Sequence, residues 1–212
     1  MSQLHRRAWR VELLRILFAA LAVSVALADV ASAGPITQDP AKVPKGDYVL
    51  DKRHSSLVVK IPHLGGFSRF TARFNGLDGG FSYDPATWAN TKVTINVDPK
   101  SISTNVEGFD AEIATKYFEV AKYPAITFVT TAAAGQDGRG TVTGDLTFRG
   151  VTKPVTLDVA FNGYGPGLPI PGNGPKMGFS GVGRINVKDF GFNAPFAGDD
   201  VDLLIEVEFE KK

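Results

Sequence analysis

The chain has 212 residues, and its 23 Lys and Arg nearly balance its 22 Asp and Glu, which gives a formal net charge of +1 at pH 7. Such a chain presents no basic field that would attract nucleic acid. It contains no Cys, which excludes disulfide bonds and a lipid-modified N-terminal Cys. At this length we expect a single domain with a sizeable core.

The first 33 residues have the features of a secretory signal peptide. Basic residues between His5 and Arg15 precede an apolar run over residues 16–28 that is too short to span a bilayer, and Ala31-Ser32-Ala33 is a small-x-small cleavage site. We therefore expect cleavage after Ala33 and export to a Gram-negative periplasm, with no integral membrane segment afterwards. The remaining chain has about as many acidic as basic residues, so nucleic acid is again not an expected partner.

Residues 34–46 contain three Pro and no periodicity, which predicts a flexible lead-in to a domain over residues 47–212. Most of that domain alternates apolar with polar residues, the pattern of half-buried strands in an antiparallel β protein. Strands are expected near residues 48–50, 57–61, 69–74, 93–97, 126–128, 177–187 and 201–209, and two more within 142–161. The turn pairs between strands are Asn75-Gly76, Asp78-Gly79, Asp84-Pro85 and Asp137-Gly138.

The two strands within residues 142–161 are expected to meet at a turn over residues 150–153. Pro154 would then begin the second strand, where its missing N–H costs the ladder least. Elsewhere Phe109, Ile113 and Tyr117 recur every four residues, which predicts a short helix over residues 109–118. Residues 162–176 are rich in Gly and Pro and are expected to form a loop.

Eight or so consecutive strands can form either a sandwich or a closed barrel, and closure removes exposed edges. An eight-stranded barrel can be filled by its own side chains or can hold one small ligand. The sequence contains 15 Phe, many at inward positions of the expected strands. The alternation alone leaves open whether they form a sealed core or the wall of an apolar cavity.

Few residues have the spacing of a catalytic or metal site. His54 and His63, the two His outside the signal peptide, would lie roughly 30 Å apart along an extended strand. Ser180 lies in a strand pattern and lacks the strand–turn–helix context of a nucleophile elbow. The acidic residues around Asp200 lack the spacing and the Gly of an EF-hand loop. We therefore predict that the protein is not an enzyme, with no catalytic residue, metal site or cofactor.

Motifs along the domain resemble, in order, those of a known family. Residues 51–57, DKRHSSL, resemble the D-x-x-H-S-x-[VIL] opening of the YceI-like proteins, a family of polyisoprenoid-binding periplasmic proteins. Matching stretches follow in the family's order at residues 62–74, 101–104, 123–128, 144–147, 150–155, 178–180, 189–191 and 200–201. The resemblance covers about residues 47–210.

This resemblance implies an all-β fold, an antiparallel eight-stranded lipocalin-like β-barrel with one short helix. It also implies an elongated apolar cavity that binds an isoprenoid or similar amphiphilic lipid, frequent homodimers, and no firmly assigned catalytic activity. Residues 109–113, FDAEI, stand where family members often have R-D-x-H-L. An Arg and a His that could have stood near the mouth are therefore missing.

We accordingly expect a periplasmic protein that binds or transports an isoprenoid-type lipid, such as a polyprenyl chain or a quinone, as its ligand. An enzyme that acts on a lipid inside the barrel, and a filled barrel with a structural or stress-protective role, are the alternatives. The strand parity through Pro62 would turn His63 inward at the mouth, where it could hydrogen-bond a head group; a surface position is the alternative. The predicted ligand-binding residues, chosen mainly by parity, are Leu57, Val59, Ile61, His63, Phe70, Phe74, Ile95, Phe128, Leu146, Phe148, Leu157, Val159 and Phe179.

Overall fold

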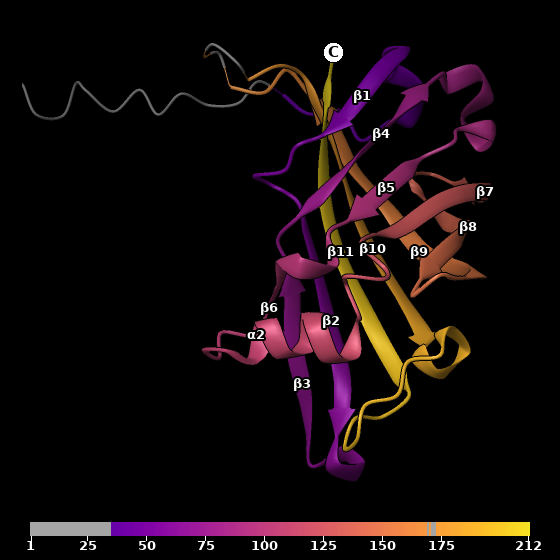
Figure 1. Cartoon of the computed structure of the whole chain (residues 1–212). Coiled ribbons are helices and arrows are strands. Elements are labelled where there is room, and N and C mark those ends of the chain that lie inside the picture. The colour runs from indigo at the N-terminus through magenta and orange to yellow at the C-terminus, as the bar shows by residue number, and fades with distance from the viewer. Residues whose placement is uncertain (1–34, 169, 171–172) are drawn as a thin grey trace, which may run out of the picture. The chain divides into compact units, whose positions relative to one another are not determined.

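The alternating segments pair into long antiparallel ladders (Figure 1). The computed structural model describes residues 35–168, 170 and 173–212. The strands are β1 (Gly46–Leu50), β2 (Ser56–His63), β3 (Ser68–Phe74), β4 (Leu77–Tyr83), β5 (Thr94–Val97), β6 (Ile102–Ser103), β7 (Ile126–Gln136), β8 (Arg139–Phe148), β9 (Val151–Gly165), β10 (Lys176–Asn186) and β11 (Asp200–Lys211). Short helical segments are η1 (Pro40–Lys42), η2 (Leu64–Gly66), η3 (Pro85–Asn90), η4 (Pro99–Ser101), α2 (Phe109–Glu112), η5 (Ile113–Tyr117) and η6 (Val187–Phe190).

Eight strands close into a barrel. Their order is β1-β4-β5-β7-β8-β9-β10-β11, and β1 pairs with both β4 and β11, which completes the ring. The strands β2, β3 and β6 continue the sheet from β11, because β2 pairs with residues 202–206 of β11 while β1 pairs with residues 209–211. The expected antiparallel eight-stranded barrel with one short helix is therefore confirmed, and the sandwich is excluded.

The short helix lies where the apolar stripe predicts it. The segments α2 and η5 run without a break from Phe109 to Tyr117, and η5 is a turn of π-helix. Ile113 is buried, and the ring of Phe109 packs edge-on against Phe70 of β3 with 5.8 Å between the ring centroids. Figure 1 shows this helical segment lying across β2 and β3. The apolar stripe thus faces the part of the sheet that continues beyond the ring.

One turn predicted from the sequence is wrong. The pair Asp78-Gly79 lies inside β4, where Asp78 pairs with Asn96 and Gly79 with Ile95 of β5. Gly79 has φ +154°, and a Cβ at this position would lie 2.2 Å from the carbonyl oxygen of Thr94. The Gly therefore permits close approach of two strands rather than a reversal of the chain. For this reason β4 is a strand although it contains a pair of residues typical of a turn.

The hairpin within residues 142–161 turns earlier than predicted. Its two central residues are Arg149 and Gly150, with φ +51° and +74°, and the ladder closes on them with Phe148 opposite Val151. Positive φ at both positions matches the twist of a tight hairpin. Pro154 lies inside β9, not at its start. β10 pairs with β9 only from Leu157 onward, so Pro154 lies in a stretch with one free edge, where a missing N–H is tolerated.

The expected lead-in and the expected Gly/Pro-rich loop both contact the barrel. Thr37 exchanges two backbone hydrogen bonds with Tyr164, at 2.8 and 2.9 Å, and Val43 is buried. The loop is shorter than predicted because β9 continues to Gly165 and β10 begins at Lys176. The lead-in and this loop therefore lie at the same end of the barrel, where β9 ends and β10 begins.

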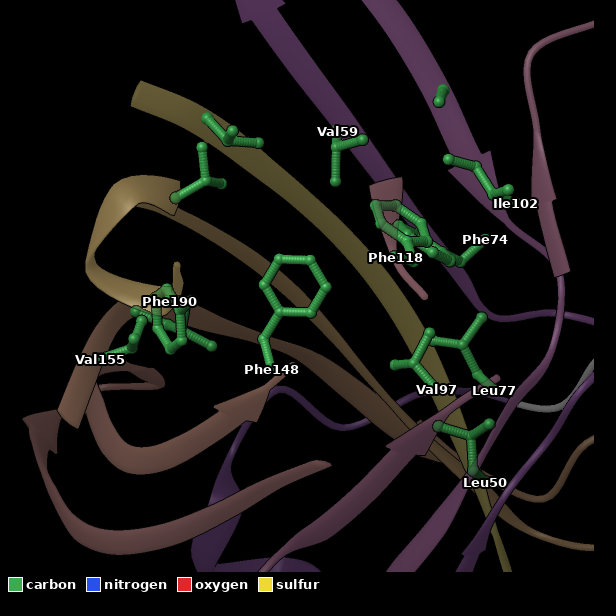
Figure 2. Close-up of a cluster of buried hydrophobic side chains, with 14 of the residues drawn as sticks. Leu50, Val59, Phe74, Leu77, Val97, Ile102, Phe118, Phe148, Val155 and Phe190 are labelled. Atoms are coloured by element: carbon green, nitrogen blue, oxygen red, sulfur yellow. The ribbon is translucent and has the colours of Figure 1, made fainter. Parts of the chain in front are cut away.

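A group of buried aromatic side chains lies toward the other end, beside the helical segment. Phe118, which follows η5, stacks on Phe74 at 6.0 Å and meets Phe148 edge-on at 5.5 Å. Phe148 also packs at 6.0 Å from Phe190 of η6 and at 5.9 Å from Phe192. Figure 2 shows Phe148 projecting into the space between Phe118 and Phe190. These five residues, each at most 8% exposed, are named the aromatic cluster below.

Candidate ligand-binding cavity

The inward faces of the strands enclose a cavity of about 650 Å³. This volume lies within the ~300–1,000 Å³ common for ligand pockets, and the same volume of liquid water would be about 20 molecules. Aliphatic and aromatic side chains line it from every ring strand except β1, and from β2 and β3. The barrel interior is therefore not filled by its own side chains.

Strand parity correctly predicted most of the wall. Eleven of the thirteen predicted ligand-binding residues line the cavity; that they contact a ligand stays a prediction. These eleven are Leu57, Val59, Ile61, Phe74, Ile95, Phe128, Leu146, Phe148, Leu157, Val159 and Phe179.

The other two predicted residues lie elsewhere. His63, the last residue of β2, is exposed and forms a backbone bridge with Ala197, and it is not part of the lining. Phe70 packs under the helical segment, against Phe109. Parity assigned both residues a side of the sheet, but β2 and β3 extend beyond the ring, so that side no longer faces the barrel interior there.

Sequence reasoning missed part of the wall. Leu203, Ile205 and Val207 of β11 line the cavity, as does Phe81 of β4. The alternation of the last strand was a sufficient signal for the first three. Phe81 lies in β4, whose Asp-Gly pair concealed the strand.

One end of the cavity is closed by aromatic rings. Phe118, Phe148 and Phe192 of the aromatic cluster line the cavity and contact one another at 5.5–6.0 Å. Phe192 also lies 6.4 Å from Tyr117 of the helical segment. Rings packed at such distances exclude water and present no charged group to the interior.

The ladder between β5 and β7 is short. Their ladder ends at Thr94 opposite Val129, and the next residue, Thr130, bonds instead to the segment before β5. Its hydroxyl donates to the carbonyl oxygen of Thr91 at 3.1 Å and accepts from the N–H of Val93 at 2.8 Å. The register of β7 against β8 then shifts between residues 130 and 132. Such a bulge bends its strand.

Some residues of the cavity lining are exposed to solvent. They include Trp88 of η3, which is 40% exposed, and the hairpin residues Gln136, Asp137 and Arg139. Asp137 and Gly138 have φ +52° and +74° and form the tight turn that the sequence predicted. We call the exposed part of the lining at Trp88 and at residues 136–139 the mouth.

A family model described as a YceI-like domain matches residues 48–209. The chain belongs to the YceI-like family. A UPF0312 protein of Vibrio cholerae is 38% identical to it over 170 residues, which are 78% of this chain and 88% of that protein.

Solved structures share this YceI-like fold. The crystal structure of BcnA from Burkholderia cenocepacia has a TM-score of 0.65 and 22% identity, over 75% of this chain and 98% of that one. A structure described as a polyisoprenoid binding domain from Saccharophagus degradans has a TM-score of 0.58 and 18% identity, over 78% of this chain and 98% of that one. At these identities the two structures support the fold alone.

In this YceI-like domain the motif D-x-x-H-S at residues 51–55 stabilises the barrel wall. Asp51, only 8% exposed, accepts hydrogen bonds from the N–H of Arg53 at 3.0 Å and from the ammonium group of Lys176. The Nδ1 atom of His54 lies 2.8 Å from the same carboxylate. Lys176 also donates to Glu210 at 3.0 Å. The motif therefore connects the turn after β1 to β10 and β11.

Hydrogen bonding sets the charges of this group. Burial would raise the pKa of Asp51, but hydrogen bonds from Lys176 and His54 hold it well below its usual range. Burial would likewise lower the pKa of Lys176, but its bonds to Asp51 and Glu210 raise it. Ligand atoms of Asp51, His54 and Glu208 lie within 4.8 Å of one another, as in some metal sites. Because Lys176 already supplies the positive charge, we interpret the group as structural.

Of the helices in the described part of the chain, none is long and apolar enough to cross a bilayer.

Proposed function

We propose that this YceI-like protein binds an isoprenoid-type lipid, such as a polyprenyl chain or a quinone, inside the barrel and carries it through the periplasm. The observation that supports the proposal best is the apolar cavity of about 650 Å³. The description of the Saccharophagus degradans structure as a polyisoprenoid binding domain supports the same chemistry for a protein of this fold.

The cavity can supply the required affinity. Burying apolar surface contributes about 25 cal/mol per Å², or about 0.8 kcal/mol per CH₂ group. Ten buried tail carbons would contribute about 8 kcal/mol, which corresponds to a dissociation constant near 1 μM before ordering costs.

Export and assembly remain part of the proposal. The signal peptide lies outside the described residues, and periplasmic fractionation with mass measurement of the mature N-terminus would test cleavage after Ala33. The homodimer that the resemblance implies is testable by sedimentation equilibrium. Both experiments are independent of lipid binding.

A binding role fits the wall better than catalysis. The charged residues of the lining are Asp137 and Arg139, both at the mouth, within the part of the chain that the structure describes. His63, the acid–base candidate of the alternative enzyme, is outside the lining. The filled barrel is disfavoured by the cavity itself.

Organic extraction and mass spectrometry of the natively purified protein test the proposal. We expect an isoprenoid lipid to co-purify with the wild type. It should also co-purify with the control variant Leu204→Trp, because the side chain of Leu204 is exposed on the outer face of β11. The neighbouring residue Ile205 lines the cavity, so Ile205→Trp should fill part of it and lose most of the lipid. Overpacking costs about 1–3 kcal/mol, so the circular dichroism spectrum must first show that the variant is folded. If no isoprenoid co-purifies or binds when added, the carrier proposal fails.

A further inference from the structure

One part of the barrel wall is closed without a β-ladder. β3 pairs with β2 and, at residues 73 and 74, with β6, whereas β8 pairs with β7 and β9. No ladder between β3 and β8 is found among the described residues. Residues 104–125 connect β6 to β7 and include the helical segment, and their Phe118 contacts Phe74 of β3 and Phe148 of β8. We call residues 104–125 the lid.

Few hydrogen bonds join the lid to the rest of the protein. Its backbone hydrogen bonds run between its own residues, such as the one that Phe118 donates to the carbonyl oxygen of Ile113 at 2.9 Å. Across residues 35–168, 170 and 173–212, every hydrogen bond between the lid and another segment comes from the side chain of Arg149. The strands of the ring, in contrast, each pair with two neighbours. A single side chain therefore supplies the directional contacts of the lid.

Arg149 reaches the lid from the turn between β8 and β9. Its guanidinium group donates hydrogen bonds to the carbonyl oxygen of Tyr117 and to the carboxylate of Glu119, the latter at 2.6 Å. The guanidinium carbon also lies 5.7 Å from the centre of the Tyr123 ring. The side chain of Arg149 is 15% exposed, but the next residue of the turn, Gly150, is exposed. The guanidinium group can therefore extend into water when the lid moves away, and opening leaves no buried charge.

Two features weaken this attachment. Glu119 has φ +52°, a left-handed conformation that is unfavourable for a residue with a side chain. The Nε atom of Arg149 is buried and has no hydrogen-bond partner in the described part of the chain, and an unmade hydrogen bond of a buried charged group is costly. The closed position of the lid is therefore less stable than a continued ladder would be.

The remaining contacts of the lid with the wall are mainly apolar. Phe118 lines the cavity and packs between Phe74 and Phe148. Apolar contacts are non-directional, so a lipid tail that passes between the rings can replace the contacts that Phe118 gives up. The mouth, in contrast, is bordered by exposed polar side chains at residues 136–139, which offer a tail no such replacement.

We propose that the lid opens sideways for the ligand: it moves away from β8 when the hydrogen bonds of Arg149 to Tyr117 and Glu119 break, and the apolar tail enters and leaves between β3 and β8. This path rests on the proposed function, because it leads to the cavity in which that function places the lipid. Arg149 lies outside the lining, so it controls the rate of exchange and not the affinity.

Exchange kinetics test the role of Arg149. The probe is a benzoquinone with a geranylgeranyl tail, because a quinone ring quenches Trp emission at short range. With Trp9→Phe, Trp88 of the lining is the single emitter in the chain. Arg149→Met should raise both the association and the dissociation rate about tenfold or more, the factor for loss of a hydrogen bond of a charged group, and leave the dissociation constant unchanged. Arg149→Lys keeps a cation and should restore part of the slow exchange.

Two control variants separate this role from a general loss of stability. Lys176→Met removes a buried ion pair between β10 and the turn after β1, so it should destabilise the fold without faster exchange. Arg184→Met removes an Arg that pairs with Asp202 but is 62% exposed, and it should change neither property. Urea unfolding measures the stability of each variant. If Lys176→Met exchanges quinone as fast as Arg149→Met, or if Arg149→Met exchanges it at the wild-type rates, the role of Arg149 is overturned.

A covalent bridge tests the opening itself and does not require Arg149→Met to fold. The chain contains no Cys, so Arg149→Cys with Glu119→Cys introduces one pair of thiols, both outside the lining. Without a bridge this double variant should exchange quinone as fast as Arg149→Met. A bis-maleimide that spans the former ion pair holds the lid closed, and most of the exchange should then be lost.

The outcomes distinguish the lid from the carrier proposal. Exchange that is equally fast in the bridged and unbridged proteins overturns the opening of the lid and leaves the carrier proposal intact, with entry through the mouth. Gel filtration of the wild type with the quinone measures equilibrium binding separately. Absence of co-elution overturns the carrier proposal, and the lid with it.

Discussion

Replacing Lys176 by Met would leave the carboxylate of Asp51 buried without its cation. The side chains of Lys176 and Asp51 are 13% and 6% exposed, so water cannot take over the lost interaction. Removing one partner of a buried ion pair costs about 3–5 kcal/mol. In a domain of this size each kcal/mol lowers the melting temperature by about 2–4 °C, so Lys176→Met should melt roughly 6–20 °C below the wild type at pH 7.

The pH dependence of this loss has a definite sign. The pKa of Asp51 is lower in the folded protein than in the unfolded chain, so its stabilisation is present above about pH 4 and is lost as the pH falls through the folded pKa. The pKa of Lys176 is raised on folding, so its stabilisation is present below about pH 10 and is lost as the pH rises through the folded pKa. The difference between wild type and Lys176→Met should therefore be largest between about pH 5 and 9 and should shrink in acid.

Thermal and urea unfolding followed by circular dichroism at pH 7 and pH 3 measure these differences. The control is Lys45→Met, because Lys45 also pairs with a carboxylate, that of Asp84 at 2.7 Å, but its side chain is 75% exposed. An exposed pair contributes about 0–1 kcal/mol. If the two variants lose the same stability at pH 7, or if the loss in Lys176→Met is unchanged at pH 3, the structural interpretation of the D-x-x-H-S motif is refuted.

Two further substitutions test the aromatic cluster and the hydrogen bonds between Thr130 and the segment before β5. Phe118→Ala should cost about 3–5 kcal/mol of unfolding free energy, because it removes a ring at the centre of the aromatic cluster. The control Phe67→Ala changes a 92% exposed position and should cost almost nothing. Similar urea midpoints for the two variants would contradict the packing role of Phe118. Thr130→Val removes the hydroxyl that bonds to the N–H of Val93 and should cost about 1–3 kcal/mol. The control is Thr131→Val, because the neighbouring Thr131 is exposed. If Thr131→Val and Thr130→Val lose the same unfolding free energy, the hydrogen bonds of Thr130 do not have this role.

The sequence identifies the faces of the strands because side chains alternate with a period of two. From Leu57 to Ile61, or from Leu157 to Val159, each inward position follows from its neighbour, whatever lies opposite. The Asp137-Gly138 turn is equally local, because its backbone needs positive φ at two successive residues. The helix over residues 109–117 follows from its apolar stripe.

Alternation cannot say where a face stops facing the interior. His63 and Phe70 continue the parity of their strands, yet β2 and β3 run past the ring at that point. Local turn signals fail for a related reason. Asp78-Gly79 has the residues of a turn, but pairing with β5 makes it part of a strand. Pro154 is predicted to begin a strand, but it lies inside β9, where β10 is not paired with it.

By itself, the sequence determined that this is an antiparallel β protein with apolar inner faces, and its ordered motifs indicated the YceI-like family. Only the tertiary structure decided that the inner faces stand apart around a cavity, that aromatic rings close one end, and that charged groups border the other. The physical reason is that each of these features depends on the distance between side chains from strands remote in sequence. The closure of the ring and the bulge in β7 set those distances, and neither leaves a periodic signal in the sequence.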